Sequence, residues 1–209
     1  MANNLKKFNT MADYSAATLN YPNVSWVVSG DSVHYAKEAP PAPANDKVMM
    51  YFEDSSTGDD VVLWNCGTSP AEPWFTEVLL NDVEINVDQC ADYGGSVAGG
   101  SLVKYTLNNT TTIADWFSGE LGAGSDVPSL EILIPAQITD IQYLPDNEIT
   151  ALVVESSTPP TIAFEQSEKP IGEIYVPDAS VSTYESNASW GSYTGSILPI
   201  SQYSGNLPL

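Results

Sequence analysis

The sequence predicts a mainly β protein: an N-terminal arm with a short helix and a hairpin, a central β-rich region, and a short C-terminal solenoid closed by a helix. Three observations support this prediction. Short apolar segments bounded by turn residues recur from residue 24 onward, polar and apolar residues alternate over residues 82–88, and three apolar segments repeat at nearly constant spacing after residue 130. We expect three regions, at residues 1–45, 46–125 and 126–209.

The N-terminal arm contains signals for one helix, one hairpin and one linker. Thr10 and Asp13 have the spacing of a capping box, which predicts a short helix ending near Ala17. Apolar residues on both sides of Ser29-Gly30-Asp31 predict a hairpin with strands at residues 24–28 and 32–35. Residues 39–44 read APPAPA, which is typical of a semi-rigid linker.

The central region is expected to consist mostly of strands. Residues 48–52 and 61–65 lie on either side of a polar turn and predict a second hairpin. Strict alternation over residues 82–88 predicts a half-buried strand with Val83, Ile85 and Val87 toward the core, and residues 102–107 predict a further strand. Thr112, with Asp115 three residues later, predicts a capped helical turn ending near Gly119.

The C-terminal region contains an internal repeat of short apolar strands. These strands are expected at residues 132–134, 152–154 and 174–176. Ile138, Ile141 and Ile149 supply apolar turn positions between the first two strands. One strand in every 20–29 residues is the pattern of a leucine-rich solenoid. Asp178 is expected to cap a closing helix that ends near Asn187, and Trp190 and Tyr193 to cover the open end of the stack.

The chain is strongly acidic and its charge is unevenly distributed. It has 27 acidic residues, six lysines, no arginine and a formal net charge of −21. Residues 1–47 are neutral, with four lysines and four acidic residues, so the other 162 residues carry all of the net charge. Such a chain repels nucleic acid and anionic membranes. The pattern indicates a neutral end that docks on a partner and an acidic body that stays solvated.

Targeting signals and cysteines indicate a protein that is made and kept in the cytoplasm or leaves by a non-secretory route. Lys6 and Lys7 are not followed by the apolar stretch of a signal peptide, and no segment is long enough to span a membrane. Cys66 and Cys90 can either pair or remain buried thiols, and a reducing compartment favours thiols.

No catalytic or metal-binding constellation stands out, so we expect no enzyme activity and no cofactor. His34 with Cys66 or Cys90 matches no nucleophile motif, and a structural histidine is favoured. Carboxylate pairs of the glycosidase type cannot be separated from chance among so many acidic residues. Two acidic clusters can be considered as calcium sites, but neither has a calcium-loop motif and a solvated surface is favoured. These clusters are Asp59-Asp60 and Asp82/Glu84/Asp88.

Two parts of the chain resemble known families. Residues 152–162 (LVVESSTPPTI) and 174–181 (IYVPDASV), followed by Tyr184, Trp190 and Tyr193, resemble the closing module of BspA-like leucine-rich-repeat proteins. This chain has fewer repeats than those proteins, so a long binding horseshoe is not expected. Residues 3–8 (NNLKKF), 21–27 (YPNVSWV) and 33–35 (VHY) resemble the start of virion proteins of crAss-like Bacteroides phages.

The second resemblance implies a structural virion protein, such as a head fibre or a capsid decoration protein. Its partners would be the major capsid protein or other virion proteins, with neither nucleic acid nor membrane involved, and copies would form a dimer or a trimer. The residues expected to dock on the capsid are Leu5, Lys6, Lys7, Phe8, Tyr14, Tyr21 and Trp26. The alternative is an adhesion or receptor-binding protein, on a phage tail or a bacterial surface, that recognises a host glycan or protein. Trp64, Trp74 and Trp116 could then stack on sugars.

Overall fold

The protein is mainly β, with about 40% of residues in strands and 13% in helices in a computed structural model. The structure describes residues 5–8, 24–29, 33–38, 46–55, 63, 75–85, 97–114, 117, 121, 127–193 and 195–209. The chain forms two compact units, Met1–Ala44 and Asn45–Leu209. The boundary expected near residue 125 therefore falls inside the second unit.

The first unit contains a three-stranded antiparallel sheet. Its strands are β1 (Leu5–Phe8), β2 (Val24–Ser29) and β3 (Val33–Glu38), in the order β1-β3-β2. Strands β2 and β3 pair from Val24 opposite Glu38 to Ser29 opposite Val33, at the position expected for the hairpin. Strand β1, which was not expected, pairs along the other edge of β3. The helix expected after Thr10 and the linker at residues 39–44 lie outside the described residues.

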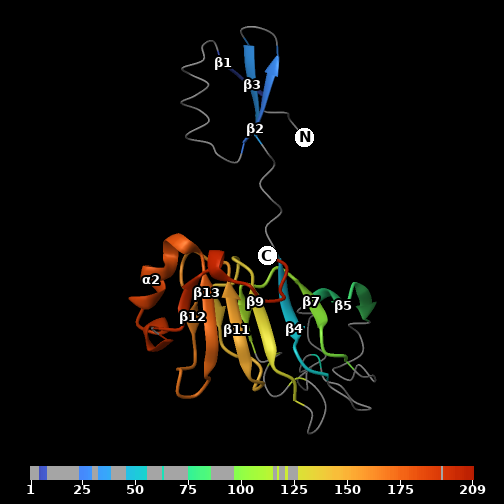
Figure 1. The fold of residues 1–209 in the computed structure, drawn as a ribbon, viewed down its shortest axis with the longest axis vertical. Helices are drawn as coiled ribbons and strands as arrows, with labels where there is room; N and C mark the ends of the chain where they lie inside the picture. Colours follow the sequence, from blue (N-terminus) through green and yellow to red (C-terminus); the bar gives the residue numbers. More distant parts are fainter. Residues whose placement is uncertain are drawn as a thin grey trace. The chain divides into compact units, whose positions relative to one another are not determined.

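The second unit is organised around an eight-stranded mixed sheet (Figure 1). Its order is β14-β13-β11-β9-β4-β7-β5-β6. The strands are β4 (Lys47–Phe52), β5 (Phe75–Leu80), β6 (Val83–Ile85), β7 (Ser101–Leu107), β9 (Leu130–Ile134), β11 (Ile149–Val154), β13 (Ile171–Val176) and β14 (Ile197–Pro199). Strands β9, β11, β13 and β14 are parallel, whereas the ladders from β9 to β6 are antiparallel.

A second, smaller sheet lies across the core from the parallel strands. Its two-residue strands are β8 (Thr112–Ile113), β10 (Asp140–Ile141) and β12 (Thr161–Ile162), and all are parallel. Along the chain they alternate with β9, β11 and β13, so each repeat supplies one long and one short strand. Ile113 and Ile141 belong to the same buried cluster as Ile132, Leu152 and Ile174.

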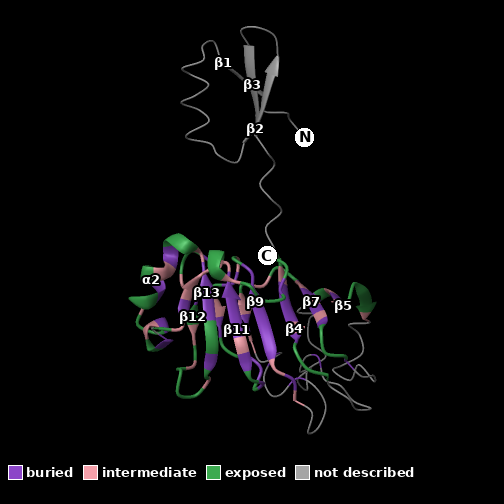
Figure 2. Ribbon diagram, in the orientation of Figure 1, coloured by how far each residue is buried: buried purple, intermediate pink, exposed green. Residues whose placement is uncertain are grey.

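The parallel strands are apolar at consecutive positions because both of their faces are covered. All five residues of β9 are buried (Figure 2). Ile132 and Ile134 belong to the core between the sheets, whereas Leu133 belongs to a separate cluster on the opposite face. By contrast, β7 alternates between buried and partly exposed residues. The three apolar strands predicted from the repeat are confirmed as adjacent members of one sheet.

The prediction that residues 48–52 and 61–65 form a hairpin is wrong. Strand β4 pairs with β7 on one edge and with β9 on the other. A strand has only two edges, so none remains for a partner at residues 61–65. The hairpin in this part of the chain is formed by β5 and the three-residue strand β6. Asn81 and Asp82 form its two-residue turn, with φ values of 50° and 65°. These values are typical of a type I′ turn.

Three finer predictions are also corrected. Val83 is 68% exposed and does not face the core, because β6 is the last strand of the sheet. Thr112 lies in β8 and caps no helix. Asp178 accepts a hydrogen bond from the Ser201 amide at 3.0 Å and gives no side-chain cap to the helix α2 (Val181–Glu185) that follows the 3₁₀ turn η2 (Asp178–Ser180). Hydrogen bonding from the Ser201 side chain, and then from the Ser201 amide, lowers the pKa of the Asp178 carboxyl.

The end of the parallel stack is closed by aromatic residues, as expected for Trp190 and Tyr193. Both are fully buried in the 3₁₀ turn η3 (Trp190–Tyr193), together with Tyr184 from α2. Each donates a hydrogen bond to a carbonyl oxygen of an earlier repeat: Tyr184 to Ser156 at 2.8 Å, Trp190 Nε1 to Pro160 at 2.7 Å, and Tyr193 to Lys169 at 2.8 Å. Burial raises the pKa of the Tyr184 and Tyr193 hydroxyls, to about 12 for Tyr193.

Candidate functional site

The residues expected to dock on a capsid lie partly in the sheet of the first unit. Leu5, Lys6, Lys7 and Phe8 form β1, and Trp26 lies in β2. Lys6 and Trp26 both pair with Ala36 of β3, so the register places them in one cross-strand row. The structure therefore brings five of the seven docking residues into one sheet. Tyr14 and Tyr21 lie outside the described residues, as do Cys66, Cys90, Trp64, Trp74 and Trp116.

Every lysine of the second unit forms an ion pair with a carboxylate of the same unit. The pairs are Lys47–Glu77 at 3.3 Å, Lys104–Asp82 at 2.6 Å and Lys169–Asp146 at 3.0 Å. Residues 45–209 contain 24 acidic residues and these three lysines, a net charge of −21. The surface of this unit therefore offers carboxylates in excess, and its cations are already neutralised.

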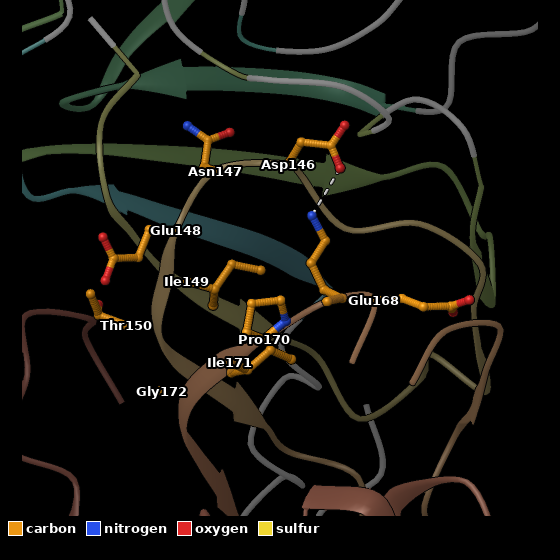
Figure 3. A pocket seen from close by; sticks show the side chains of 10 residues that line it. Asp146, Asn147, Glu148, Ile149, Thr150, Glu168, Pro170, Ile171 and Gly172 are labelled. Atoms are coloured by element: carbon orange, nitrogen blue, oxygen red, sulfur yellow. Dashed lines mark hydrogen bonds and ion pairs between the residues drawn. The ribbon is translucent and has the colours of Figure 1, made fainter. Parts of the chain in front are cut away.

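A cleft of about 620 Å³ opens beside the segments that lead into β11 and β13 (Figure 3). Asp146, Glu148 and Glu168 line it. Lys169 points its Nζ at the carbonyl oxygen of Pro145 and at Asp146, so the one cation of the cleft is neutralised. The three carboxylates outnumber the single lysine, so the cleft can attract a cationic group.

Close backbone approach shapes this cleft. A Cβ on Gly172 would lie 2.5 Å from the carbonyl oxygen of Thr150, so only glycine lets β13 approach β11 here.

Partial burial raises the pKa of the nearby Glu53 carboxyl, a hydrogen bond from Thr150 opposes the increase, and neighbouring carboxylates add to it. Within the described ranges, no three histidine, cysteine, aspartate or glutamate side chains converge on a metal-sized site.

The most elaborate polar site lies on the face of the large sheet that points away from the small sheet, here called the second face. Its cluster of apolar side chains consists of Met49, Leu133, Ala151, Val153, Tyr175 and Leu207. The last of these belongs to residues 200–209, here called the covering segment, which crosses the parallel strands toward β4 (Figure 1). Tyr203 and Ile200 of the same segment pack against the cluster.

A buried carboxylate holds the covering segment on the second face. Glu131 of β9 is only 3% exposed. Its carboxylate accepts hydrogen bonds from the Tyr203 hydroxyl, from the Asn206 amide at 2.8 Å and from Asn206 Nδ2 at 2.6 Å. Leu207 then donates its amide to the Tyr203 hydroxyl at 2.7 Å. Three donors from one segment therefore converge on one buried carboxyl group, so the segment is tied to β9 by polar contacts.

Aromatic contact completes the site. The rings of Tyr175 and Tyr203 meet edge to face with their centroids 5.1 Å apart. Burial, together with a hydrogen bond to Glu173, raises the pKa of the Tyr175 hydroxyl to about 12. Burial and the contact with Glu131 likewise raise the pKa of Tyr203. Both phenols therefore stay protonated at neutral pH and act as hydrogen-bond donors.

Sequence reasoning missed Glu131, because the predicted strand was taken to begin at Ile132. One signal was present: Glu131 is the only charged residue in the apolar stretch LEILI. A charge inside a fully buried strand requires partners, which points to a polar segment packed on that face. The residues that supply those partners, Tyr203 and Asn206, are 72 and 75 positions away and carry no local signal.

Comparison with known proteins found no matching family model, no curated relative and no similar solved structure. In the part of the chain that the structure describes, no helix is long and apolar enough to cross a membrane.

Proposed function

We propose that this chain is a structural protein of a bacteriophage virion, a head fibre or decoration protein that docks on the capsid through residues 1–45. The observation that carries the proposal is the contrast between the two units. Residues 1–44 contain three lysines and three acidic residues, whereas residues 45–209 have a net charge of −21. A neutral unit can approach a protein surface at low electrostatic cost, and an acidic unit resists adsorption and self-association.

The proposed docking surface is the three-stranded sheet of the first unit. Leu5, Phe8 and Trp26 would supply apolar contact area, and Lys6 and Lys7 would meet carboxylates on the capsid. The acidic second unit would project from the particle and keep neighbouring copies apart. The proposal involves no catalytic step, no cofactor, and neither nucleic acid nor membrane as a partner.

We assign the C-terminal repeats to a short leucine-rich-repeat-like solenoid. Support comes from the two parallel ladders, β9-β11-β13-β14 and β8-β10-β12, whose members alternate along the chain. The spacing of the long strands and the aromatic closing module agree with this assignment. We also propose that copies form a dimer or a trimer, because elongated proteins of repeated assemblies are commonly symmetric oligomers.

Binding to purified capsids tests the proposal directly. The full chain should sediment with capsids, whereas a chain that begins at residue 46 should remain in the supernatant although its circular dichroism shows a folded second unit. Capsid binding by the shortened chain would contradict docking through the first unit.

A charge-matched pair of variants sharpens the test. Lys6→Glu/Lys7→Glu and Lys47→Glu/Lys104→Glu change the net charge equally, but only the first alters the proposed docking sheet. We expect capsid binding to weaken at least tenfold, about 1.4 kcal/mol, in the first variant only. Equal weakening in both would show that net charge, not a docking surface, controls attachment.

Copy number separates the two candidate functions. Quantitative mass spectrometry of purified particles should give copies of this chain in a fixed, high ratio to the major capsid protein. A dozen copies or fewer per particle would instead favour the receptor-binding alternative, because tail and portal positions are few.

A further inference from the structure

The covering segment resembles a bound peptide more than a continuation of the sheet. Its hydrogen bonds to the described strands are the three that end on the Glu131 carboxylate, and none is a backbone ladder with a neighbouring strand. Its apolar anchor, Leu207, sits in a cluster whose other buried members all come from β4, β9, β11 and β13. The second face therefore has the features of a peptide-binding site: the buried Glu131 carboxylate, the apolar cluster around Leu207 and the ring of Tyr175.

The site also discriminates among sequences. A Cβ on Gly205 would collide with the Glu131 carboxylate and would lie 2.6 Å from the Tyr203 hydroxyl, so a larger residue would have to displace the two side chains that hold the segment. Asn206 satisfies both carboxylate oxygens, one through its backbone amide and one through its side chain. The recognised pattern is thus Tyr-Ser-Gly-Asn-Leu at residues 203–207. Removing any one donor would leave part of a buried carboxylate unpaired, which is costly.

Charge makes the segment suited to reach a second copy. Residues 186–209 contain no acidic or basic side chain, in a unit whose net charge is −21. An uncharged segment approaches another acidic body without the repulsion that separates the bodies themselves. The segment follows directly after Pro199, the last residue of β14. Near that point it is also held by the exposed hydrogen bond from the Ser201 amide to Asp178.

We propose that the second face, read by Glu131 and Tyr175, is a peptide-binding site that accepts residues 200–209 of a second copy of this chain in place of its own. The contacts are the same in both arrangements, so concentration decides between them. A segment tethered by a short linker has an effective concentration on the order of millimolar. Exchange therefore becomes substantial when copies are crowded to a similar concentration, and reciprocal exchange closes as a two-fold dimer.

A peptide supplied in trans tests the site. Gly205→Val should displace the chain's own segment while leaving Glu131 and Tyr175 in place. A fluorescein-labelled peptide of residues 199–209 should then bind this variant saturably in an anisotropy titration. The same peptide should bind Gly205→Val/Glu131→Ala at least tenfold more weakly, and a peptide with phenylalanine in place of Tyr203 should also bind more weakly. Absence of peptide binding to a Gly205→Val chain with native near-ultraviolet circular dichroism would overturn the proposal.

A second measurement needs no variant. Sedimentation velocity of the unaltered chain over a rising concentration series should show dimers at the highest concentrations. An excess of the unlabelled peptide should dissociate these dimers into monomers, because the peptide occupies the second face of each copy. A chain that stays monomeric at millimolar concentration, or a dimer that the peptide leaves intact, would refute exchange. Neither result depends on whether residues 1–45 dock on a capsid, so the two proposals fail separately.

Discussion

Asn147 allows the sharpest test of how the second unit is held together. The residue lies between β10 and β11 and is only 3% exposed. Its Oδ1 accepts a hydrogen bond from the Leu121 amide at 2.8 Å, and its Nδ2 donates to the carbonyl oxygens of Leu121 at 2.7 Å and Pro128 at 2.9 Å. One side chain therefore fixes the segment that leads into β9. Asn147→Ala leaves one amide and two carbonyl groups of that buried segment without partners.

The cost can be worked out from those three groups. Each buried polar group that loses its partner costs about 1–3 kcal/mol. Water that enters the space left by the side chain would bond to some of these groups. We therefore expect the free energy of unfolding to fall by about 3 kcal/mol. For a unit of this size, about 3 kcal/mol corresponds to a Tm roughly 6–12 °C lower. Asn147→Asp should cost more at neutral pH, because a carboxylate oxygen would face two carbonyl oxygens. Part of that loss should return in acid, when the new carboxyl is protonated.

Urea denaturation of the two variants, followed by tryptophan fluorescence and circular dichroism, measures these differences. Gln142→Ala is the matched control, because it also removes a side-chain amide, but one that is exposed and donates to the exposed carboxylate of Asp140 at 2.8 Å. The unfolding free energy of the control should lie within about 0.5 kcal/mol of that of the unaltered chain. If Asn147→Ala also lies within that range, the claim that this side chain stabilises the fold through Leu121 and Pro128 is refuted.

Three further predictions follow from single contacts. Gly172→Ala should lower the unfolding free energy by more than 1 kcal/mol, because its Cβ would force β13 away from Thr150; an unchanged urea midpoint would contradict this. Trp190→Phe should cost about 1–3 kcal/mol in the same assay by orphaning the Pro160 carbonyl, whereas equal stability would show that water replaces the indole. Glu53 has a raised folded pKa, so its ionisation opposes folding; Glu53→Gln should therefore stabilise the chain at pH 7, with the gain vanishing as the pH falls below the unfolded value of 4.5. A gain that persists at pH 3 would exclude this explanation.

The sequence predicted those strands whose burial is uniform or strictly alternating. Residues 132–134, 152–154 and 174–176 are apolar at every position because both faces of these strands are covered, and the 20- and 22-residue spacing reflects their parallel stacking. Strand β7 was equally visible, since its alternation follows one buried and one partly exposed face. In each case the signal lies within the strand itself.

Elements that depend on distant partners were not predictable in this way. Strand β4 looked like half of a hairpin, but its neighbours β7 and β9 come from positions about 50 and 80 residues later in the chain. The two-residue strands β8, β10 and β12 are too short to show any periodicity. The turn at Asn81-Asp82 carried a usable signal, because both residue types tolerate a positive φ, and it would have located the β5–β6 hairpin.

The residues that break the local pattern are the ones that join one segment of the second unit to another. Glu131 places a charge in an apolar strand, Asn147 places an amide in the core, and Gly172 leaves a strand position without a side chain. Each is costly where it stands, and each is matched by a contact from elsewhere: Tyr203 and Asn206 for Glu131, Leu121 and Pro128 for Asn147, and the backbone of β11 for Gly172. Local exceptions of this kind mark positions where tertiary structure selects the residue. Glu131 is unlike the other two because its partners follow β14 in the covering segment, whereas the partners of Asn147 and Gly172 come before β14 in the chain. The same contacts can therefore be made by another copy of the chain, which is why this position, and not the acidic cleft, is where we expect binding specificity to lie.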